Sequence, residues 1–165
     1  MVYMKITFRE YKNKDKQLLL GLSNKLAAHS KQIDPLKRVL NLPGFVEIDV
    51  AEMLENVQKY KGKIWFAQHE GNVVGYIIGA IWVQSDKNKL EIGSHILGEV
   101  LDLYLNEKYR EKGIGSKMLA MMESYFKENN CDSMWIQVFA LNHPAHNLYK
   151  KHGFADREIG MLKNI

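Results

Sequence analysis

The sequence predicts one α/β (α+β) domain, a mixed, mostly antiparallel central sheet of six to seven strands with helices on both faces. Three observations support this prediction. The 165 residues suffice for one domain with a real core, and we expect all of 1–165 to form it. A hydrophobic content of 46% and a charged content of 25% exclude disordered and fibrous classes. A hairpin pattern followed by a strand-helix-strand crossover requires both antiparallel and parallel strand pairs.

The chain before the hairpin is expected to contain one strand and two helices. Loose alternation of apolar and polar residues predicts the strand at Tyr3–Arg9. Leucines at helical spacing predict a helix from about 13 to 30. Two prolines make the segment 32–48 partly irregular. Asp49 and, three residues later, Glu52 form a capping-box pattern, so we expect the second helix to begin at Asp49.

The hairpin and the elements after it follow from β-rich runs and one strong helical pattern. Two runs, 63–67 and 73–78, flank the turn residues Glu70-Gly71-Asn72, and the second run can continue to Val83 before a polar loop at 85–89. The remaining predicted elements are a central strand at 100–105, a glycine turn, an amphipathic helix from about Ile114, a strand at 134–139, a helix at about 144–152 and a last strand from about Phe154.

Composition excludes several functional classes. Cys131 is the only cysteine, so the chain can form neither an intrachain disulfide nor a cysteine-based metal cage. No segment approaches the ~20 apolar residues of a membrane span, and the N-terminus lacks the apolar core of a signal peptide. We therefore expect a cytoplasmic protein that is not bound to a membrane. The net charge is +4, but the basic residues are scattered among acids, which argues against nucleic-acid binding.

The segment Gly113-Ile114-Gly115-Ser116 lies between a predicted strand and a predicted helix. Glycines let backbone amides approach a ligand closely, and the free N–H groups of a helix's first turn attract anions. A pyrophosphate is therefore a suitable ligand, with Arg110 and Lys112 adding positive charge nearby. Met118 replaces the third glycine of a dinucleotide-binding fingerprint, and the order of residues does not fit a P-loop. A plain strand-to-helix turn remains the alternative.

Two motifs together resemble those of the GNAT acyltransferase superfamily. The residues Tyr109-Arg110-Glu111-Lys112-Gly113-Ile114-Gly115 resemble its Q/R-x-x-G-x-G/A signature. Downstream, the segment from Asn142 to Phe154 resembles its N-x-x-A-x-x-x-Y-x-x-x-G-F pattern. The two motifs occur in the expected order, separated by one predicted helix and one predicted strand. They cover about the last third of the chain, and the order of elements extends the resemblance more weakly to the rest.

The resemblance implies acetyl-CoA as the acyl-donor cosubstrate, without a metal. Its pyrophosphate would lie on the glycine turn, and its pantetheine arm would run beside the central strand, where a bulge splays the neighbouring strands. The implied cofactor-binding residues are Leu103, Tyr104, Leu105, Arg110, Glu111, Lys112, Gly113, Ile114, Gly115, Ser116, Asn142 and Tyr149. The predicted histidine-bearing helix lacks the further ligands that a metal site needs.

The resemblance also implies catalytic roles, beside which structural roles stay open. Tyr149 matches the general acid that protonates the leaving thiolate, but it can equally be a packing residue. Asn142 matches an asparagine near the cofactor arm and also suits a helix N-cap. Glu99, eleven positions before Arg110, is the first choice for the base that deprotonates the acceptor amine. The alternative for Glu99 is an exposed acid at a strand edge.

Two further residues are candidates for binding the acceptor. Asp102 shares one face of the predicted central strand with Tyr104 and is a reserve candidate for binding or deprotonating the amine. Trp82 can line the acceptor pocket. The polyamine-acetylating branch has consecutive glutamate and aspartate where this chain has Leu101-Asp102. Bacterial protein N-terminal acetyltransferases tend to have glutamate at the position of Gln137. Both differences count against those branches.

The predicted function is transfer of an acetyl group from acetyl-CoA to a primary amine of a small molecule or a peptide by direct attack. A noncatalytic acyl-CoA-binding regulatory domain is the main alternative, because it would keep the glycine turn without needing Tyr149 or Glu99. A nucleic-acid-binding accessory protein is a third reading, which predicts a steep salt dependence of binding. The acceptor and the oligomeric state, including a homodimer, stay open.

Overall fold

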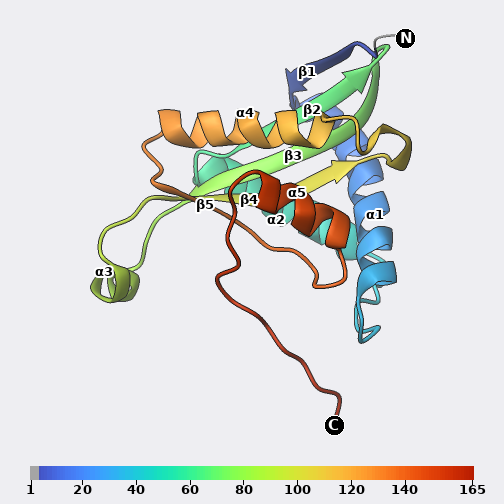
Figure 1. Ribbon diagram of the computed structural model, residues 1–165. Coiled ribbons are helices and arrows are strands. Elements are labelled where there is room, and N and C mark those ends of the chain that lie inside the picture. Colours follow the sequence, from blue (N-terminus) through green and yellow to red (C-terminus); the bar gives the residue numbers. More distant parts are fainter. Residues whose placement is uncertain (1–3) are drawn as a thin grey trace.

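A five-stranded sheet forms the centre of the molecule (Figure 1). The computed structural model describes residues 4–165. Within them the spatial order of strands is β1-β2-β3-β4-β5, antiparallel from β1 to β4 and parallel between β4 and β5. The strands are β1 Ile6–Glu10, β2 Lys63–His69, β3 Asn72–Trp82, β4 Leu97–Leu105 and β5 Ser133–Ile136. The predicted mixed, mostly antiparallel sheet is confirmed, whereas the expected six to seven strands are one or two more than these residues form.

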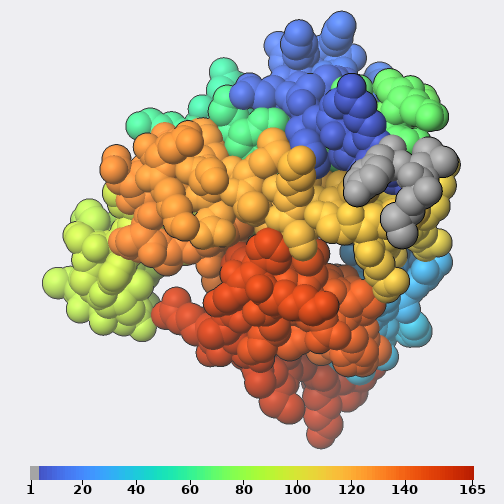
Figure 2. Space-filling model, turned by 45° about the horizontal axis from the view of Figure 1, so that its top comes forward, coloured from blue at the N-terminus to red at the C-terminus, as the bar shows by residue number. Residues whose placement is uncertain are grey.

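Helices cover both faces of the sheet. The first face carries α1 (Lys16–Ile33) and α2 (Phe45–Lys59), and the second carries α4 (Ile114–Glu128) and α5 (His143–Lys151). Figure 2 shows α4 (orange) and α5 (red-orange) side by side on the second face, with α3 (Asp86–Ile92, lime) at the edge of the molecule. Two 3₁₀ turns, η1 (Asn13–Asp15) and η2 (Glu107–Tyr109), precede α1 and α4.

Buried side chains form one core layer on each face of the sheet. Because successive residues of a strand point to opposite faces, β3 supplies Tyr76 and Ile78 to the first layer and Ile77 to the second. Burial of each large apolar side chain contributes roughly 1.5–3 kcal/mol. The first layer includes Leu19, Leu22, Val50, Phe66 and Tyr104, and the second includes Val100, Leu105, Met118, Met122, Phe126 and Tyr149.

Glycines within two strands let α4 lie close to the sheet. A Cβ on Gly98 would lie 2.4 Å from the ring of Phe126, and one on Gly79 would lie 2.6 Å from the sulfur of Met122. No side chain fits at either position without displacing α4, so these glycines fix its distance from the sheet. The start of α4 is thereby held at the end of β4, where the glycine turn lies.

Several predicted boundaries are wrong, for identifiable reasons. The second helix begins at Phe45, because Gly44 adopts the left-handed conformation (φ 89°) and opens it there, so Asp49 and Glu52 lie inside the helix. The predicted polar loop at 85–89 forms most of α3, with Ser85 accepting a hydrogen bond from the Asn88 N–H as its N-cap. Tyr3, the expected start of the first strand, lies outside the described residues.

The chain after α5 is not a strand, contrary to the prediction of a last strand from about Phe154. Asp156 is held against α5 by His146 Nε2 at 2.6 Å and by Lys150 Nζ at 2.9 Å. These contacts direct the following residues away from the edge of β5, and Figure 1 shows the tail running away from the body. The strand predicted at 134–139 is correspondingly shorter, ending at Ile136.

Candidate active site

The strands β4 and β5 separate halfway along β4. Their parallel pairing ends at Val100 and Ile136. The next residue, Leu101, forms a β-bulge, because no β3 residue pairs with it although both of its neighbours are paired. Beyond the bulge, β4 keeps its hydrogen bonds to β3, and within residues 4–165 no strand lies on its other side. The bulge that the family resemblance implied therefore lies at Leu101, and the edge of Leu103–Leu105 that does not pair with β3 faces a gap between the strands.

A cleft of about 290 Å³ occupies this gap. Four elements meet around it: α1, β4, the segment that follows β5, and α5 with its N-cap. The fold thus brings together predicted site residues that are far apart in the sequence. Its lining includes His29 of α1, Asp102 and Leu103 of β4, Gln137 after β5, and Asn142 and Tyr149 at α5.

The glycine turn opens α4 with unpaired backbone donors. Gly113 is the N-cap in the left-handed conformation (φ 75°), which strongly favours glycine. The first helical hydrogen bond runs from Lys117 N–H to Gly113 O at 3.1 Å. The N–H groups of Ile114, Gly115 and Ser116 precede that bond and have no helical acceptor, so they are available to an anion at the positive end of the helix dipole.

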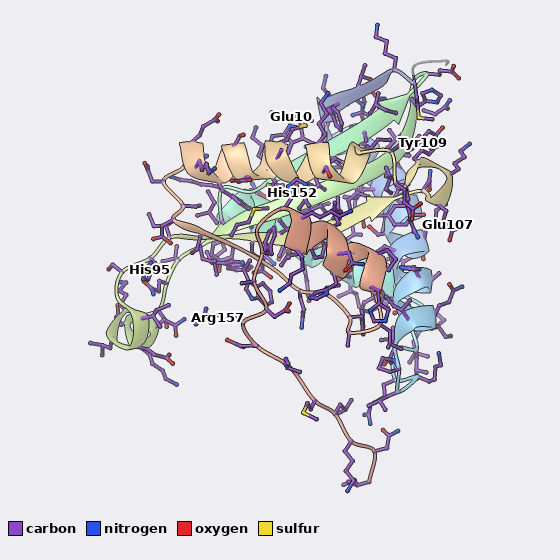
Figure 3. All side chains as sticks on the ribbon, viewed as in Figure 1. Glu10, His95, Glu107, Tyr109, His152 and Arg157 are labelled. Atoms are coloured by element: carbon purple, nitrogen blue, oxygen red, sulfur yellow. The ribbon has the colours of Figure 1, made fainter. Side chains whose placement is uncertain are left out.

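Side chains of the turn hold its shape. Arg110 Nε donates to the carbonyl of Leu105 at 3.0 Å, and Lys112 Nζ donates to the carbonyl of Lys108 at 2.5 Å. Tyr109 is buried and its hydroxyl lies 3.2 Å from His69 Nδ1 of β2. Figure 3 shows Glu107 and Tyr109 in the connection between β4 and α4. The predicted residues Glu111 and Lys112 are exposed, so their charges face solvent beside the free N–H groups.

Tyr149 lies in the interior, at the wall of the cleft. Its side chain is only 7% exposed and its ring centroid lies 5.8 Å from that of Phe154. Burial, with a further contribution from the negative charge of Asp102, raises the pKa of Tyr149 to about 12. The phenol is therefore protonated at neutral pH. Tyr149 thus both packs in the core and lines the cleft.

Asn142 has the capping role that its position suggested. Its side-chain oxygen accepts a hydrogen bond from the Ala145 N–H at 3.3 Å, and Pro144 occupies the first turn of α5. The same side chain lines the cleft. By fixing the start of α5, Asn142 sets the position of Tyr149 two turns along the helix.

Two half-buried carboxylates, Glu99 and Asp102, lie on the same face of β4, before and after the bulge. Burial raises the pKa of Glu99. Burial also raises the pKa of Asp102, to about 7, opposed by a hydrogen bond from Tyr76 and reinforced by the charge of Asp49. Of the two, only Asp102 lines the cleft with Tyr149.

Trp82 is at the end of β3, away from that cleft. Its ring centroid lies 4.5 Å from that of Tyr60, on the α2 side of the sheet. Its Nε1 is buried and lacks a protein hydrogen-bond acceptor at bonding distance within residues 4–165. Trp82 therefore lies near Glu99, before the bulge, whereas Asp102 follows the bulge and lines the cleft with Tyr149.

Sequence reasoning missed the residues that surround Asp102 from other elements. Tyr76 of β3 donates to Asp102 Oδ2 at 2.8 Å, and Ser23 of α1 lies 3.1 Å from the Tyr76 hydroxyl. His29 of α1 lines the cleft, and burial lowers its pKa. The available signal was Ser23, a polar residue on the leucine stripe of α1. A serine in an apolar stripe indicates a buried hydrogen bond.

Residues 4–165 contain neither a metal-binding cluster nor a membrane-spanning helix. No group of three or more histidine, cysteine, aspartate or glutamate side chains is arranged there to hold a metal ion. No helix in that part of the chain combines the length and the apolar character required to cross a membrane.

A comparison of the sequence with models of protein families agrees with the cleft, the free helix N-terminus and the two motifs. The model of the acetyltransferase (GNAT) family matches residues 33–154. The chain belongs to the GNAT family. The match includes α2, the whole sheet except β1, the glycine turn and α5. The family membership expected from the two motifs is confirmed.

Curated relatives of this GNAT protein are amine acetyltransferases by name. An N-alpha-acetyltransferase of Sulfurisphaera tokodaii is 34% identical over 113 residues, which cover 67% of this chain and 66% of that protein. A thialysine N-epsilon-acetyltransferase of Bos taurus is 30% identical over 159 residues, which cover 92% of this chain and 85% of that protein. The chain thus spans about two thirds of the archaeal relative and most of the bovine one.

Solved structures share the fold. A predicted acetyltransferase from Clostridium acetobutylicum, solved with acetyl-CoA, has a TM-score of 0.72 at 20% identity, covering 97% of this chain and 96% of that one. A Bacillus halodurans protein has a TM-score of 0.79 at 16% identity, covering 96% and 99%. At these identities the similarity establishes the architecture alone. It confirms the α/β fold class.

Proposed function

We propose that this GNAT protein transfers an acetyl group from acetyl-CoA to a primary amine of a small molecule or a peptide. One observation carries the proposal: a carboxylate and a phenol, Asp102 and Tyr149, line one cleft, and α5, which carries Tyr149, packs through Leu148 against Gly115 in the first turn of α4. A base and an acid on one substrate cleft, next to an anion site, suit acyl transfer from a phosphate-bearing thioester.

The described residues fit acetyl-CoA as the donor. The N–H groups of Ile114, Gly115 and Ser116 would bind the pyrophosphate. Gly113 has no side chain to block its approach. The edge of Leu103–Leu105 that no strand covers would hydrogen-bond the pantetheine arm as a strand does, with the Leu105 carbonyl already accepting from Arg110. Bound there, acetyl-CoA supplies the thioester whose carbonyl carbon the amine attacks.

Asp102 is the base that the geometry favours, with Glu99 as the other candidate. The amine must lose a proton as it attacks, and a base with a pKa near the working pH serves best. Asp102, whose pKa burial raises to about 7, meets that condition within the cleft. Glu99 lies on the same face but nearer to Trp82, where it suits contact with the rest of the acceptor.

Proton transfer to Asp102 would also prepare Tyr149 as the acid. Part of the rise in the Tyr149 pKa comes from the negative charge of Asp102. When Asp102 takes the amine proton, that charge disappears and the phenol becomes a stronger acid. The C–S bond then breaks with its electron pair going to sulfur, and the sulfur takes the Tyr149 proton. Exchange with water returns both groups to their starting states.

Cationic acceptors suit the electrostatics of this face. Asp49 of α2 lies near enough to raise the pKa of Asp102, and Glu99 lies on the same side of the sheet. Together they favour a protonated amine in the encounter complex. The relatives' names specify an α-amine in one case and an ε-amine in another, so both peptide N-termini and lysine-like side chains are acceptors to test.

The test combines an acceptor screen with one substitution. Purified protein, acetyl-CoA and a panel of amines (peptide N-termini, lysine analogues and polyamines) are followed by mass spectrometry for a gain of one acetyl group. Tyr149→Phe is expected to lower kcat by about 100-fold or more while leaving the Kd for acetyl-CoA unchanged, because it removes the proton donor alone. Tight binding of acetyl-CoA without turnover on any amine would favour the noncatalytic acyl-CoA-binding domain.

A further inference from the structure

A chain of buried hydroxyl groups leads from α1 through β3 to Asp102. The Ser23 Oγ lies 3.1 Å from the Tyr76 hydroxyl, and the Tyr76 hydroxyl donates to Asp102 Oδ2 at 2.8 Å. Ser23 is 4% exposed and Tyr76 is completely buried. Three elements thus converge on one oxygen of one carboxylate. Neither hydroxyl is needed to fill space, because phenylalanine and alanine have nearly the same shapes without a polar atom.

The number of available protons determines which hydroxyl group donates and which accepts in this series of hydrogen bonds. A tyrosine hydroxyl has one proton, and Tyr76 gives it to Asp102 Oδ2. The Ser23 hydroxyl must therefore be the donor to the Tyr76 oxygen while Asp102 is ionised. The second carboxylate oxygen, Oδ1, has no hydrogen-bond partner in the described part of the chain. Asp102 thus has one oxygen held by the core and one available to the cleft.

We propose that Tyr76, supported by Ser23, is a positioning residue for the base: it holds Oδ2 of Asp102 so that Oδ1 receives the proton of the acceptor amine. This inference rests on the proposed acetyl transfer. It assigns to two core residues on other elements a role in the chemistry of β4. The nitrogen lone pair forms the new N–C bond while the carbonyl π pair moves to oxygen, and the amine N–H proton goes to Oδ1. The carbonyl then re-forms as the C–S bond breaks, its electron pair going to the sulfur, which takes the Tyr149 proton.

The groups that face Asp102 set the expected sign of the effect. They are His29 on α1, Asp49 on α2, Tyr76 on β3 and Tyr149 on α5. Burial and the charge of Asp49 favour the protonated carboxyl, whereas the hydrogen bond from Tyr76 favours the ionised form and lowers the pKa. Burial also lowers the pKa of His29, which disfavours its charged form. Loss of the Tyr76 hydroxyl therefore moves the titration of Asp102 to higher pH.

The first experiment measures the pH profile of kcat/KM for the acceptor in wild type and Tyr76→Phe. The rising limb, which reports the free base, is expected to move up by about one pH unit, the effect of losing one hydrogen bond to a charged group. Below the limb the rate then falls about tenfold, with the Kd for acetyl-CoA unchanged. Tyr125→Phe is the matched control: Tyr125 lies on α4, its hydroxyl donates to the Lys61 carbonyl at 2.6 Å, and the pH profile of the variant should match that of wild type.

A second variant keeps the test decisive if Tyr76→Phe folds poorly. Ser23→Ala should move the limb in the same direction by a smaller amount, because Tyr76 still donates. The double variant should move it no further than Tyr76→Phe alone, since the two hydroxyls act in series. A limb that stays in place in every folded variant overturns the proposal. The proposal is also overturned if the two single variants shift the limb equally and the double variant shifts it by the sum of both.

Carboxyl ¹³C NMR separates this inference from the proposed function. It follows the titration of Asp102 without substrate, with Asp102→Asn identifying the resonance. A shifted titration in Tyr76→Phe, together with no acetyl transfer by wild type to any amine, would refute the proposed function and leave the hydrogen-bonded control of Asp102 in place. An unshifted titration in a wild type that does acetylate amines would refute the role of Tyr76 alone.

Discussion

Substitution of Gly113 separates a ligand-binding turn from a plain one. Gly113→Ala places a Cβ on a residue with φ 75°, which costs roughly 1–2 kcal/mol for a non-glycine residue. No atom lies within 4 Å of that Cβ, so no clash adds to the cost. For a chain of 165 residues each kcal/mol lowers the Tm by about 2–4 °C, and the expected loss is therefore about 2–8 °C. Thermal unfolding followed by circular dichroism measures it.

The same substitution has a separate effect on acetyl-CoA. The added methyl group would stand where the pyrophosphate approaches the N–H groups of α4. Loss of one hydrogen bond to a charged group, about 1.5–3 kcal/mol, corresponds to a roughly 10- to 100-fold weaker Kd in a calorimetric titration. The folded variant is titrated well below its Tm, so that instability does not lower the apparent affinity.

Gly115→Ala is the control for the effect on stability. Its Cβ would lie 3.2 Å from Leu148 Cδ2, the end of a flexible side chain, and helix propensity favours alanine there by about 1 kcal/mol. Its Tm is expected to change little. A Gly113→Ala protein with a lowered Tm but wild-type affinity would refute the anion site and leave the glycine with a purely geometric role. An unchanged Tm would contradict the left-handed turn itself.

Two further predictions concern single side chains. Asp102 has a folded-state pKa of about 7, raised from 3.8, so the folded protein keeps this proton longer than the unfolded chain, and the group's contribution to stability is lost as pH rises from about 4 to 7. Asp102→Asn should remove this pH dependence of stability and raise the free energy of unfolding at pH 8 by up to about 4 kcal/mol. Urea denaturation at several pH values measures the effect. Equal pH slopes of the free energy of unfolding in both proteins would contradict the raised pKa of Asp102. Asn142→Ala removes the N-cap of α5 and should lower the free energy of unfolding by about 1 kcal/mol, which corresponds to a fall of about 2–4 °C in Tm. An unchanged Tm would show that Asn142 serves the ligand alone.

The elements that sequence patterns located correctly are those with strong local signals. The hairpin between β2 and β3, the amphipathic helix α4 and the N-cap of α5 each depend on residues within one turn or one strand pair. The start of α2 was wrong because Gly44 opens the helix before the weaker capping pattern at Asp49. The last strand was wrong because contacts of Asp156 with α5, which no local pattern encodes, direct the tail away.

The same distinction applies to the site. The glycine turn and Tyr149 were identifiable because each lies in a motif of fixed spacing. The arrangement around Asp102 was not, because it joins Ser23, Tyr76 and Asp102 from three elements through hydrogen bonds. Long-range contacts of this kind depend on sheet register, and a shift of one residue reverses the face of every side chain that follows.

The bulge at Leu101 connects the two halves of the proposed reaction. In a regular strand, Glu99 and Asp102 are three residues apart and would point to opposite faces. One extra residue restores the alternation, so Glu99 pairs with Ala80 and Asp102 with Ile78 on a single face. The same extra residue lies where β4 separates from β5 and exposes the backbone to the cleft. A single irregularity thus both opens the edge proposed for the cofactor and brings the two carboxylates to the face proposed for the acceptor.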